Sequence, residues 1–146
     1  MSRVLLVLSL VALLGAGCSR ESEQRLLSIQ IGERTLQLEI KRTPEEQAQG
    51  LSGRDALPEG QGMLFVFPSA GNYGFWMKDM RFAIDIVWLE GDTIVGIERG
   101  VPAPTTSDEP PATVYPPKPV DRVLELTAGH ADDFGLKEGM RLEGLP

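Results

Sequence analysis

Short segments in which apolar and polar residues alternate recur along this chain, and they favour folds built from β-strands. Residues 26–31 and 35–40 both follow this pattern, and a glycine-containing segment, 32–34, lies between them. This spacing predicts a β-hairpin with one buried face and one face exposed to water. Residues 63–67 contain no polar side chain, so both faces of this segment must be covered. We therefore expect a central strand there that ends at Pro68.

The remaining segments complete a mainly β chain. Further strands are predicted at 73–77, 84–89, 93–99 and 120–127. Two short helices are also predicted: one begins with a capping box at Thr43, and the other lies within 128–134. Seven of the eleven prolines lie within 101–119, which predicts a long loop. The expected fold class is mainly β, as a compact single-domain sandwich or open barrel with two short helices.

The first residues differ from the rest of the chain. Arg3 precedes an apolar run over 4–14, which is shorter than the roughly 20 residues that a membrane-spanning helix needs. The sequence GAGC at 15–18 follows and resembles the lipobox of bacterial lipoproteins, in which the chain is cut before the cysteine and the thiol carries a lipid. The expected organisation is a lipoprotein-type signal peptide at 1–17, a lipidated Cys18 with a flexible tether at 18–25, and one β-rich domain at 26–146.

A lipid on Cys18 also predicts a location. Cys18 is the only cysteine of the chain, so no disulfide can form within it, and lipidation explains a lone cysteine in an exported protein. The acyl chains would hold the protein on the membrane. Ser19 stands where many inner-membrane lipoproteins of enteric bacteria have Asp, and this resemblance favours the outer membrane, with the domain facing the periplasm. The alternative is an ordinary secretory signal followed by an incidental cysteine.

The charge and the residue types exclude several functions. The chain has 14 Lys and Arg against 21 Asp and Glu, a net charge of −7. Nucleic-acid binding relies on an excess of cations, so nucleic acid is not an expected partner. A zinc site of ordinary type needs several His or Cys ligands, and the chain offers only His130 and Cys18. We therefore expect no metal and no cofactor.

Three motifs resemble a known family. They are GMLFVF at 62–67, FWMKD at 75–79 and IDI at 84–86. Together with VLEL at 123–126, they are similar to the pattern of the bacterial and archaeal domain of unknown function 192. The resemblance covers nearly all of the chain after the tether. It implies a compact, mostly β domain and implies no established reaction.

Asp85 lies among the apolar residues of the predicted strand at 84–89. A buried carboxylate needs a cation, hydrogen bonds or water. Lys78, Arg54 and Arg81 are the nearest cations by motif. Two interpretations are open: a charged pocket in which Lys78 and Arg54 receive an anionic or polar ligand, or a structural ion pair that fixes the connection between two strands.

Aromatic residues gather in one part of the chain. Seven of the nine lie between positions 65 and 88. Trp76, with its neighbours Tyr73 and Phe75, therefore forms either a platform on which a ligand stacks or part of the hydrophobic core.

The leading functional hypothesis is a membrane-anchored, non-catalytic envelope domain that binds a small polar ligand or a partner protein. Its candidate site consists of Arg54, Trp76, Lys78 and Asp85. An alternative is an envelope hydrolase that acts on glycan or peptidoglycan, with Asp85 and Glu125 as the acid/base pair. That alternative requires both carboxyl groups in one cleft, about 5 to 10 Å apart. A further alternative is a structural partner of an envelope assembly that makes contact through the 101–119 loop.

Overall fold

The structure is a computed structural model that describes residues 26–106 and 108–146. Its main element is a mixed six-stranded sheet that does not close into a barrel, in the order β1-β2-β3-β8-β5-β6. A second sheet pairs the short strands β4 and β7. The strands are β1 (Leu27–Ile31), β2 (Arg34–Lys41), β3 (Gln61–Gly71), β4 (Phe75–Trp76), β5 (Ile84–Glu90), β6 (Thr93–Val101), β7 (Thr113–Val114) and β8 (Val120–Thr127). The helices are α1 (Pro44–Gln49) and α2 (His130–Asp133), which confirms a mainly β domain with two short helices.

The predicted hairpin and the first predicted helix are both present. Strands β1 and β2 pair antiparallel, and β3 then lies parallel to β2 because the chain crosses over through α1. The Thr43 side chain accepts a hydrogen bond from the Glu46 amide, and the Glu46 carboxylate accepts one from the Thr43 amide. This capping box, with Pro44 at the first helical position, fixes where the helix begins.

The six-stranded sheet separates two hydrophobic cores, and the pairing register shows which side chains share a face. Leu64 of β3 lies opposite Leu124 of β8, and these residues belong to the core on one side, which we call the Leu64 face. Met63 lies opposite Glu125 and belongs to the core on the other side, the Met63 face. Because neighbouring residues of a strand point to opposite faces, every polar residue of the sheet belongs to one of these two faces.

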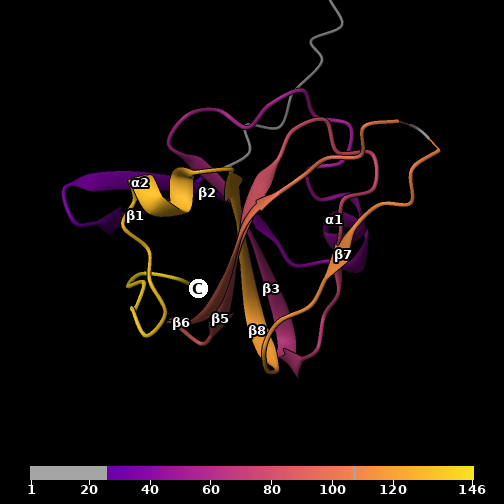
Figure 1. Ribbon diagram of the computed structural model, residues 1–146. Coiled ribbons are helices and arrows are strands. Elements are labelled where there is room, and N and C mark those ends of the chain that lie inside the picture. Colours follow the sequence, from indigo (N-terminus) through magenta and orange to yellow (C-terminus); the bar gives the residue numbers. More distant parts are fainter. Residues whose placement is uncertain (1–25, 107) are drawn as a thin grey trace, which may run out of the picture.

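The two faces are covered by different parts of the chain. Helix α2 and the C-terminal segment cover the Leu64 face, and Ala131 and Leu142 are buried in its core. The Met63 face is covered by the segments around Leu51, Leu57 and Met77 and by the small β4–β7 sheet. In Figure 1 the sheet is seen nearly edge-on, with α2 on one side and with α1 and β7 on the other. The Met63 face is thus covered mainly by loops.

Two predicted boundaries were wrong. Strand β3 does not end at Pro68 but continues to Gly71. Its register with β8 shifts between Val66 and Gly71, and such a bulge tolerates a residue that lacks an N–H group. The strand predicted at 73–77 is reduced to the two residues of β4, because the chain turns there to pair with Thr113 and Val114 in the proline-rich segment.

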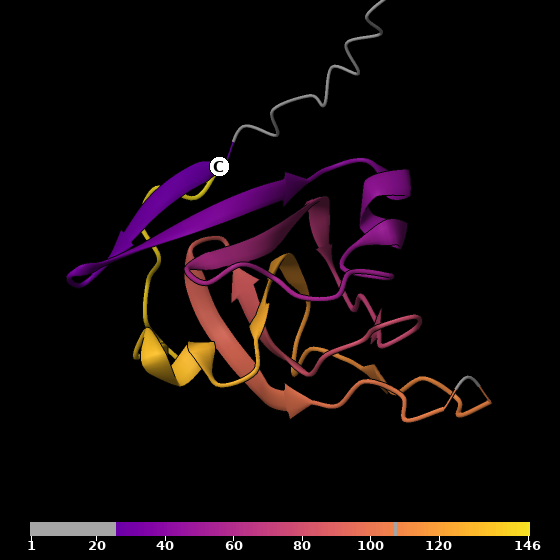
Figure 2. The same ribbon diagram turned by 90° about the horizontal axis from the view of Figure 1, so that it is seen from above.

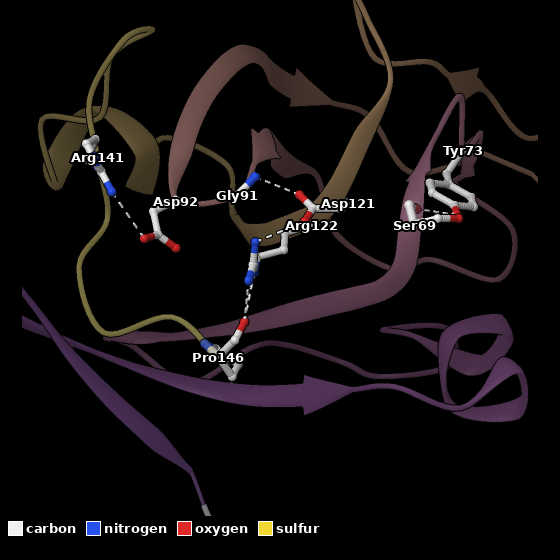
Figure 3. A network of polar contacts seen from close by, with 8 residues as sticks. All are labelled: Ser69, Tyr73, Gly91, Asp92, Asp121, Arg122, Arg141 and Pro146. Carbon is white, nitrogen blue, oxygen red and sulfur yellow. Dashed lines mark hydrogen bonds and ion pairs between the residues drawn. The ribbon is translucent and has the colours of Figure 1, made fainter.

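The C-terminal segment is fastened to the sheet by charged groups (Figure 3). The Arg122 guanidinium donates to the carbonyl oxygen of Pro146 through Nε at 2.9 Å and Nη2 at 2.6 Å. Arg141 forms an ion pair of 3.5 Å with Asp92 in the turn between β5 and β6. The C-terminal segment also runs back to β1, because Gly144 lies against the Ile29 side chain; Figure 2 shows this segment from above.

The predicted signal peptide at 1–17, Cys18 and the tether at 18–25 lie outside the described residues. Within the described part of the chain, neither helix is long and apolar enough to cross a membrane.

Candidate functional site

Asp85 belongs to the Leu64 face, where it is 1% exposed. Its Oδ1 accepts a hydrogen bond from the Gly100 amide at 2.9 Å, and its Oδ2 accepts one from the Ala131 amide at 2.9 Å. The carboxylate thus joins the end of β6 to the first turn of α2. The Ala131 amide lies in that turn, where backbone N–H groups have no partner within the helix. The partners predicted from the sequence, Lys78, Arg54 and Arg81, are wrong, because backbone amides satisfy both oxygens.

Arg54 lies on the opposite side of the sheet and forms a partly buried ion pair with Glu39. Its Nη1 and Nη2 donate to Oε1 and Oε2 of Glu39 at 2.6 and 2.8 Å. Lys41 Nζ lies 3.4 Å from Oε2 of the same carboxylate. The hydrogen bonds from Arg54 lower the pKa of Glu39 below its usual value, and the same contact raises the pKa of Arg54. Arg54 therefore attaches the loop after α1 to the Met63 face.

Glu125 is the other carboxyl group buried on the Met63 face. Burial raises its pKa to about 8, and the charge of Arg54 opposes that rise only in part. No residue in the described part of the chain makes a hydrogen bond to its Oε2. At neutral pH the folded protein therefore holds Glu125 mainly in its protonated form.

Asp85 and Glu125 do not share a cleft. Asp85 lies opposite Leu126 in the β5–β8 ladder, whereas Glu125 lies opposite Ile86. The two side chains consequently point to opposite faces of one sheet. The acid/base pair required by the hydrolase alternative is absent from this fold.

A cavity of about 720 Å³ opens between the segments at 49–53, 78–81 and 104–111. We call it the polar cavity, because cations, hydroxyl groups, an amide and two carboxylates lie around it. Its lining residues are Gln49, Ser52, Gly53, Lys78, Asp79, Met80, Arg81, Pro104, Thr105, Thr106, Glu109 and Pro111.

Two hydrogen bonds hold one wall of the polar cavity together. Ser52 Oγ donates to the Lys78 carbonyl at 2.9 Å, and the Gly53 amide donates to the Asp79 carbonyl at 2.8 Å. Asp79 has a φ of +57°, in the left-handed region that Asp and Asn adopt more readily than most residues. The turn at 78–80 is therefore fixed by its backbone, which leaves the Lys78 side chain at the cavity.

Lys78 is the cation most available to a ligand in the polar cavity. No carboxylate of the described residues lies within ion-pair distance of its Nζ. The Nζ lies instead 5.4 Å from the centre of the Trp76 ring, in a cation–π contact. Arg81, the other cation of the cavity, pairs with the exposed carboxylate of Asp55.

A second cavity of about 350 Å³ lies beside Trp76, and we call it the aromatic cavity. Its lining residues are Gln47, Ala48, Phe65, Phe67, Tyr73, Gly74, Phe75 and Trp76. Phe67 and Tyr73 stack face to face at 3.7 Å, and Phe75 packs edge-on against Phe65. Trp76 remains 51% exposed. The aromatic segment thus supplies both core and a surface cavity.

The structure brings together only part of the site predicted from the sequence. Trp76 and Lys78 are neighbours at the surface, whereas Arg54 is engaged by Glu39 and Asp85 lies on the other face. Glu39 was missed because it falls on the hairpin face predicted to be exposed to water, and Lys41 because the predicted strand ended one residue before it. The described residues contain no group of three His, Cys, Asp or Glu side chains arranged to hold a metal ion.

These features define a mainly β domain with an open mixed sheet, a charged cluster buried on one face and two cavities above it. The chain belongs to the family called domain of unknown function 192, described as "Uncharacterized ACR", whose model matches residues 27–144. The resemblance stated from the motifs is confirmed.

Two solved structures share this fold. A protein of unknown function from Novosphingobium aromaticivorans DSM 12444 is 25% identical with a TM-score of 0.72, and the match covers 85% of this chain and 89% of that one. A protein from Sinorhizobium meliloti 1021, described as a proposed transcription regulator, is 31% identical with a TM-score of 0.67, over 81% of this chain and 90% of that one. No curated protein is significantly similar to this chain.

Proposed function

We propose that this protein is a membrane-anchored envelope lipoprotein whose domain binds a small anionic ligand in the polar cavity. The observation that carries the ligand proposal is Lys78, a cation with no ion-pair partner among the described residues, at a cavity of about 720 Å³. Cavities of roughly 300 to 1,000 Å³ are typical of small-molecule sites. An ammonium group that no carboxylate neutralises attracts an anion.

The Glu109 carboxylate at the polar cavity is not suited to proton transfer. Glu109 accepts hydrogen bonds from the Thr105 amide at 2.6 Å and from the Thr105 hydroxyl at 2.8 Å. These bonds lower the pKa of Glu109, so it remains ionised and holds the loop in place. A general acid or base at neutral pH needs a pKa near 7, whereas the pKa of Glu109 is lowered further below that value.

Titration with propionate, followed by NMR of the backbone amides, tests this proposal. We expect saturable shifts at 78–81 in the wild-type domain and their loss in Lys78→Met, which keeps much of the length of the side chain but removes its charge. The matched control is Lys118→Met, because Lys118 is an exposed lysine that pairs with Glu90 away from both cavities. Equal binding by Lys78→Met and the wild type, or no binding of propionate at all, would show that the proposal is wrong.

The anchor is tested separately. The lipobox-like sequence before Cys18 supports a diacylglycerol on its thiol, and Ser19 supports the outer membrane. Mass spectrometry of the protein isolated from a Gram-negative host should find residues 1–17 removed and Cys18 lipidated. Cys18→Ser should move the protein out of the membrane fraction. An unmodified Cys18 thiol in the isolated protein would contradict the anchor and leave the ligand proposal intact.

A further inference from the structure

The polar and the aromatic cavities meet at one short segment. Trp76 lines the aromatic cavity, and Lys78, two residues later, lines the polar cavity. The Lys78 Nζ lies 5.4 Å from the centre of the Trp76 ring, so the cation of one cavity adjoins the wall of the other. A single ligand can therefore present an apolar part to the rings and an anionic part to the ammonium group.

The aromatic cavity favours a ring with few hydrogen-bonding groups. Five of its lining residues are aromatic. Besides the indole N–H of Trp76, its polar side chains already have partners: Gln47 Nε2 donates to the Val66 carbonyl at 3.0 Å, and the Tyr73 hydroxyl donates to the Ser69 carbonyl at 2.8 Å. A sugar ring would bring several hydroxyl groups into a place that offers them few partners, which is costly. An aromatic ring needs none and packs well against aromatic walls.

We propose that the natural ligand is an aromatic carboxylate, with its ring in the aromatic cavity beside Trp76 and its carboxylate at Lys78. This inference rests on the proposed function, because it uses the same ammonium group. Trp76 is half exposed when no ligand is bound, and a stacked ring would cover it. A carboxylate placed near the ammonium and close to low-dielectric aromatic walls interacts with it more strongly than it would in open water.

NMR titration with four probes tests the ligand class. The probes are phenylpropionate, which has both parts, propionate, which has only the anion, phenylpropanol, which has only the ring, and glucuronate, an acidic sugar. We expect phenylpropionate to bind at least about tenfold more tightly than any of the other three, since each part contributes to the binding free energy. The Trp76 indole signal, assigned by its loss in Trp76→Phe, should shift with phenylpropionate. The Ala131 amide, which bonds to Asp85 on the far face, should not.

Substitutions at Trp76 provide the second measurement. Trp76→Ala should weaken phenylpropionate binding by about tenfold and leave propionate binding unchanged, and Trp76→Phe should restore most of the lost affinity. Phe134→Ala is the matched control, because Phe134 packs against the core of the Leu64 face and lines neither the polar nor the aromatic cavity. It should bind phenylpropionate as the wild type does.

The outcomes separate this inference from the proposed function. If propionate or glucuronate binds as tightly as phenylpropionate, and Lys78→Met abolishes that binding, the aromatic carboxylate is wrong and the anion site stands. If phenylpropanol binds as tightly as phenylpropionate, the carboxylate does not reach Lys78 and the aromatic carboxylate is wrong, whereas the proposed function is still decided by propionate binding to the wild type and to Lys78→Met. If Trp76→Ala binds phenylpropionate unchanged, the ring does not lie in the aromatic cavity and the inference is overturned.

Discussion

The two faces of the central sheet bury carboxyl groups on adjacent strands in opposite ways. On the Leu64 face, two backbone amides satisfy Asp85. On the Met63 face, Glu125 has an oxygen with no hydrogen-bond partner among the described residues, and its pKa is raised to about 8. Backbone amides satisfy the oxygens of a buried carboxyl group, whereas burial without partners favours the neutral form of Glu125. Ionisation of Glu125 therefore opposes the fold.

The two faces also differ in what covers them. The Leu64 face is closed by α2 and by the C-terminal segment that Arg122 and Arg141 hold in place. The Met63 face is covered by loops, and both the polar and the aromatic cavity open in that cover. Binding residues commonly lie on loops that a rigid scaffold positions. The comparison predicts that substitutions on the Leu64 face affect mainly stability, and that those in the outer layer over the Met63 face affect mainly binding.

Asp85→Ala should have the largest effect on stability. It leaves the Gly100 and Ala131 amides without their acceptor in the interior, and each unpaired amide costs about 1 to 3 kcal/mol. We expect the free energy of unfolding to fall by about 4 kcal/mol in urea denaturation. The control Asp132→Ala removes an exposed carboxylate that pairs with Arg99, and it should cost about 0.5 kcal/mol. A loss below about 1 kcal/mol for Asp85→Ala would refute the structural role of Asp85.

Glu125 should make the stability depend on pH. Between about 4.5 and about 8 the folded protein holds the Glu125 proton while the unfolded chain has released it. The contribution of this group is therefore fully present below about pH 4.5, is lost progressively as the pH rises to about 8, and is constant above that. The slope can reach about 1 kcal/mol per pH unit.

Glu125→Gln isolates this contribution because the amide does not titrate. Urea denaturation between about pH 5 and about pH 9 should show that the variant is more stable than the wild type at the alkaline end. Its free energy of unfolding should also fall less than that of the wild type from the lower pH to the higher. Parallel profiles for the two proteins would mean that Glu125 is ionised in the folded state at neutral pH.

The sequence predicts the scaffold better than the site, for a physical reason. Strand periodicity and the capping box at Thr43 are local signals, so the hairpin, α1 and β8 were all predicted near their observed positions. The positions of charged groups depend on what covers them. Glu39 occupies a polar position of the hairpin, and the loop after α1, which brings Arg54 to its carboxylate, lies over this face of the sheet. Asp85 was recognised as buried, but its partners are backbone amides, which no residue type reveals.

Arg54→Met should have a smaller effect than Asp85→Ala. It removes the bidentate partner of Glu39 and leaves that carboxylate with Lys41 nearby. A buried ion pair that loses one partner costs about 3 to 5 kcal/mol, but the Arg54 side chain is 31% exposed, so we expect about 2 kcal/mol in urea denaturation. The pKa of Glu125 should also rise further, because the Arg54 charge opposes that rise in the wild type.

The exposed ion pair between Arg81 and Asp55 provides the matched control for Arg54. Arg81→Met removes a guanidinium that is bonded to a carboxylate at the surface, where water screens the interaction. It should cost less than about 0.5 kcal/mol. If Arg54→Met and Arg81→Met lower the free energy of unfolding equally, the partial burial of the Arg54–Glu39 ion pair does not increase its contribution to stability.

Lys78→Met should have a much smaller effect on stability than Arg54→Met while abolishing the binding of propionate. Within the described part of the chain, its ammonium group lies over the Trp76 ring and forms no ion pair, and an exposed cation–π contact contributes about 0.5 to 1 kcal/mol at most. Urea denaturation should therefore place Lys78→Met within about 1 kcal/mol of the wild type. If Lys78→Met lowers the free energy of unfolding as much as Asp85→Ala does, Lys78 is part of the scaffold. The expected difference between the two faces, stability on one and binding over the other, would then be wrong at the residue on which the proposed binding site depends.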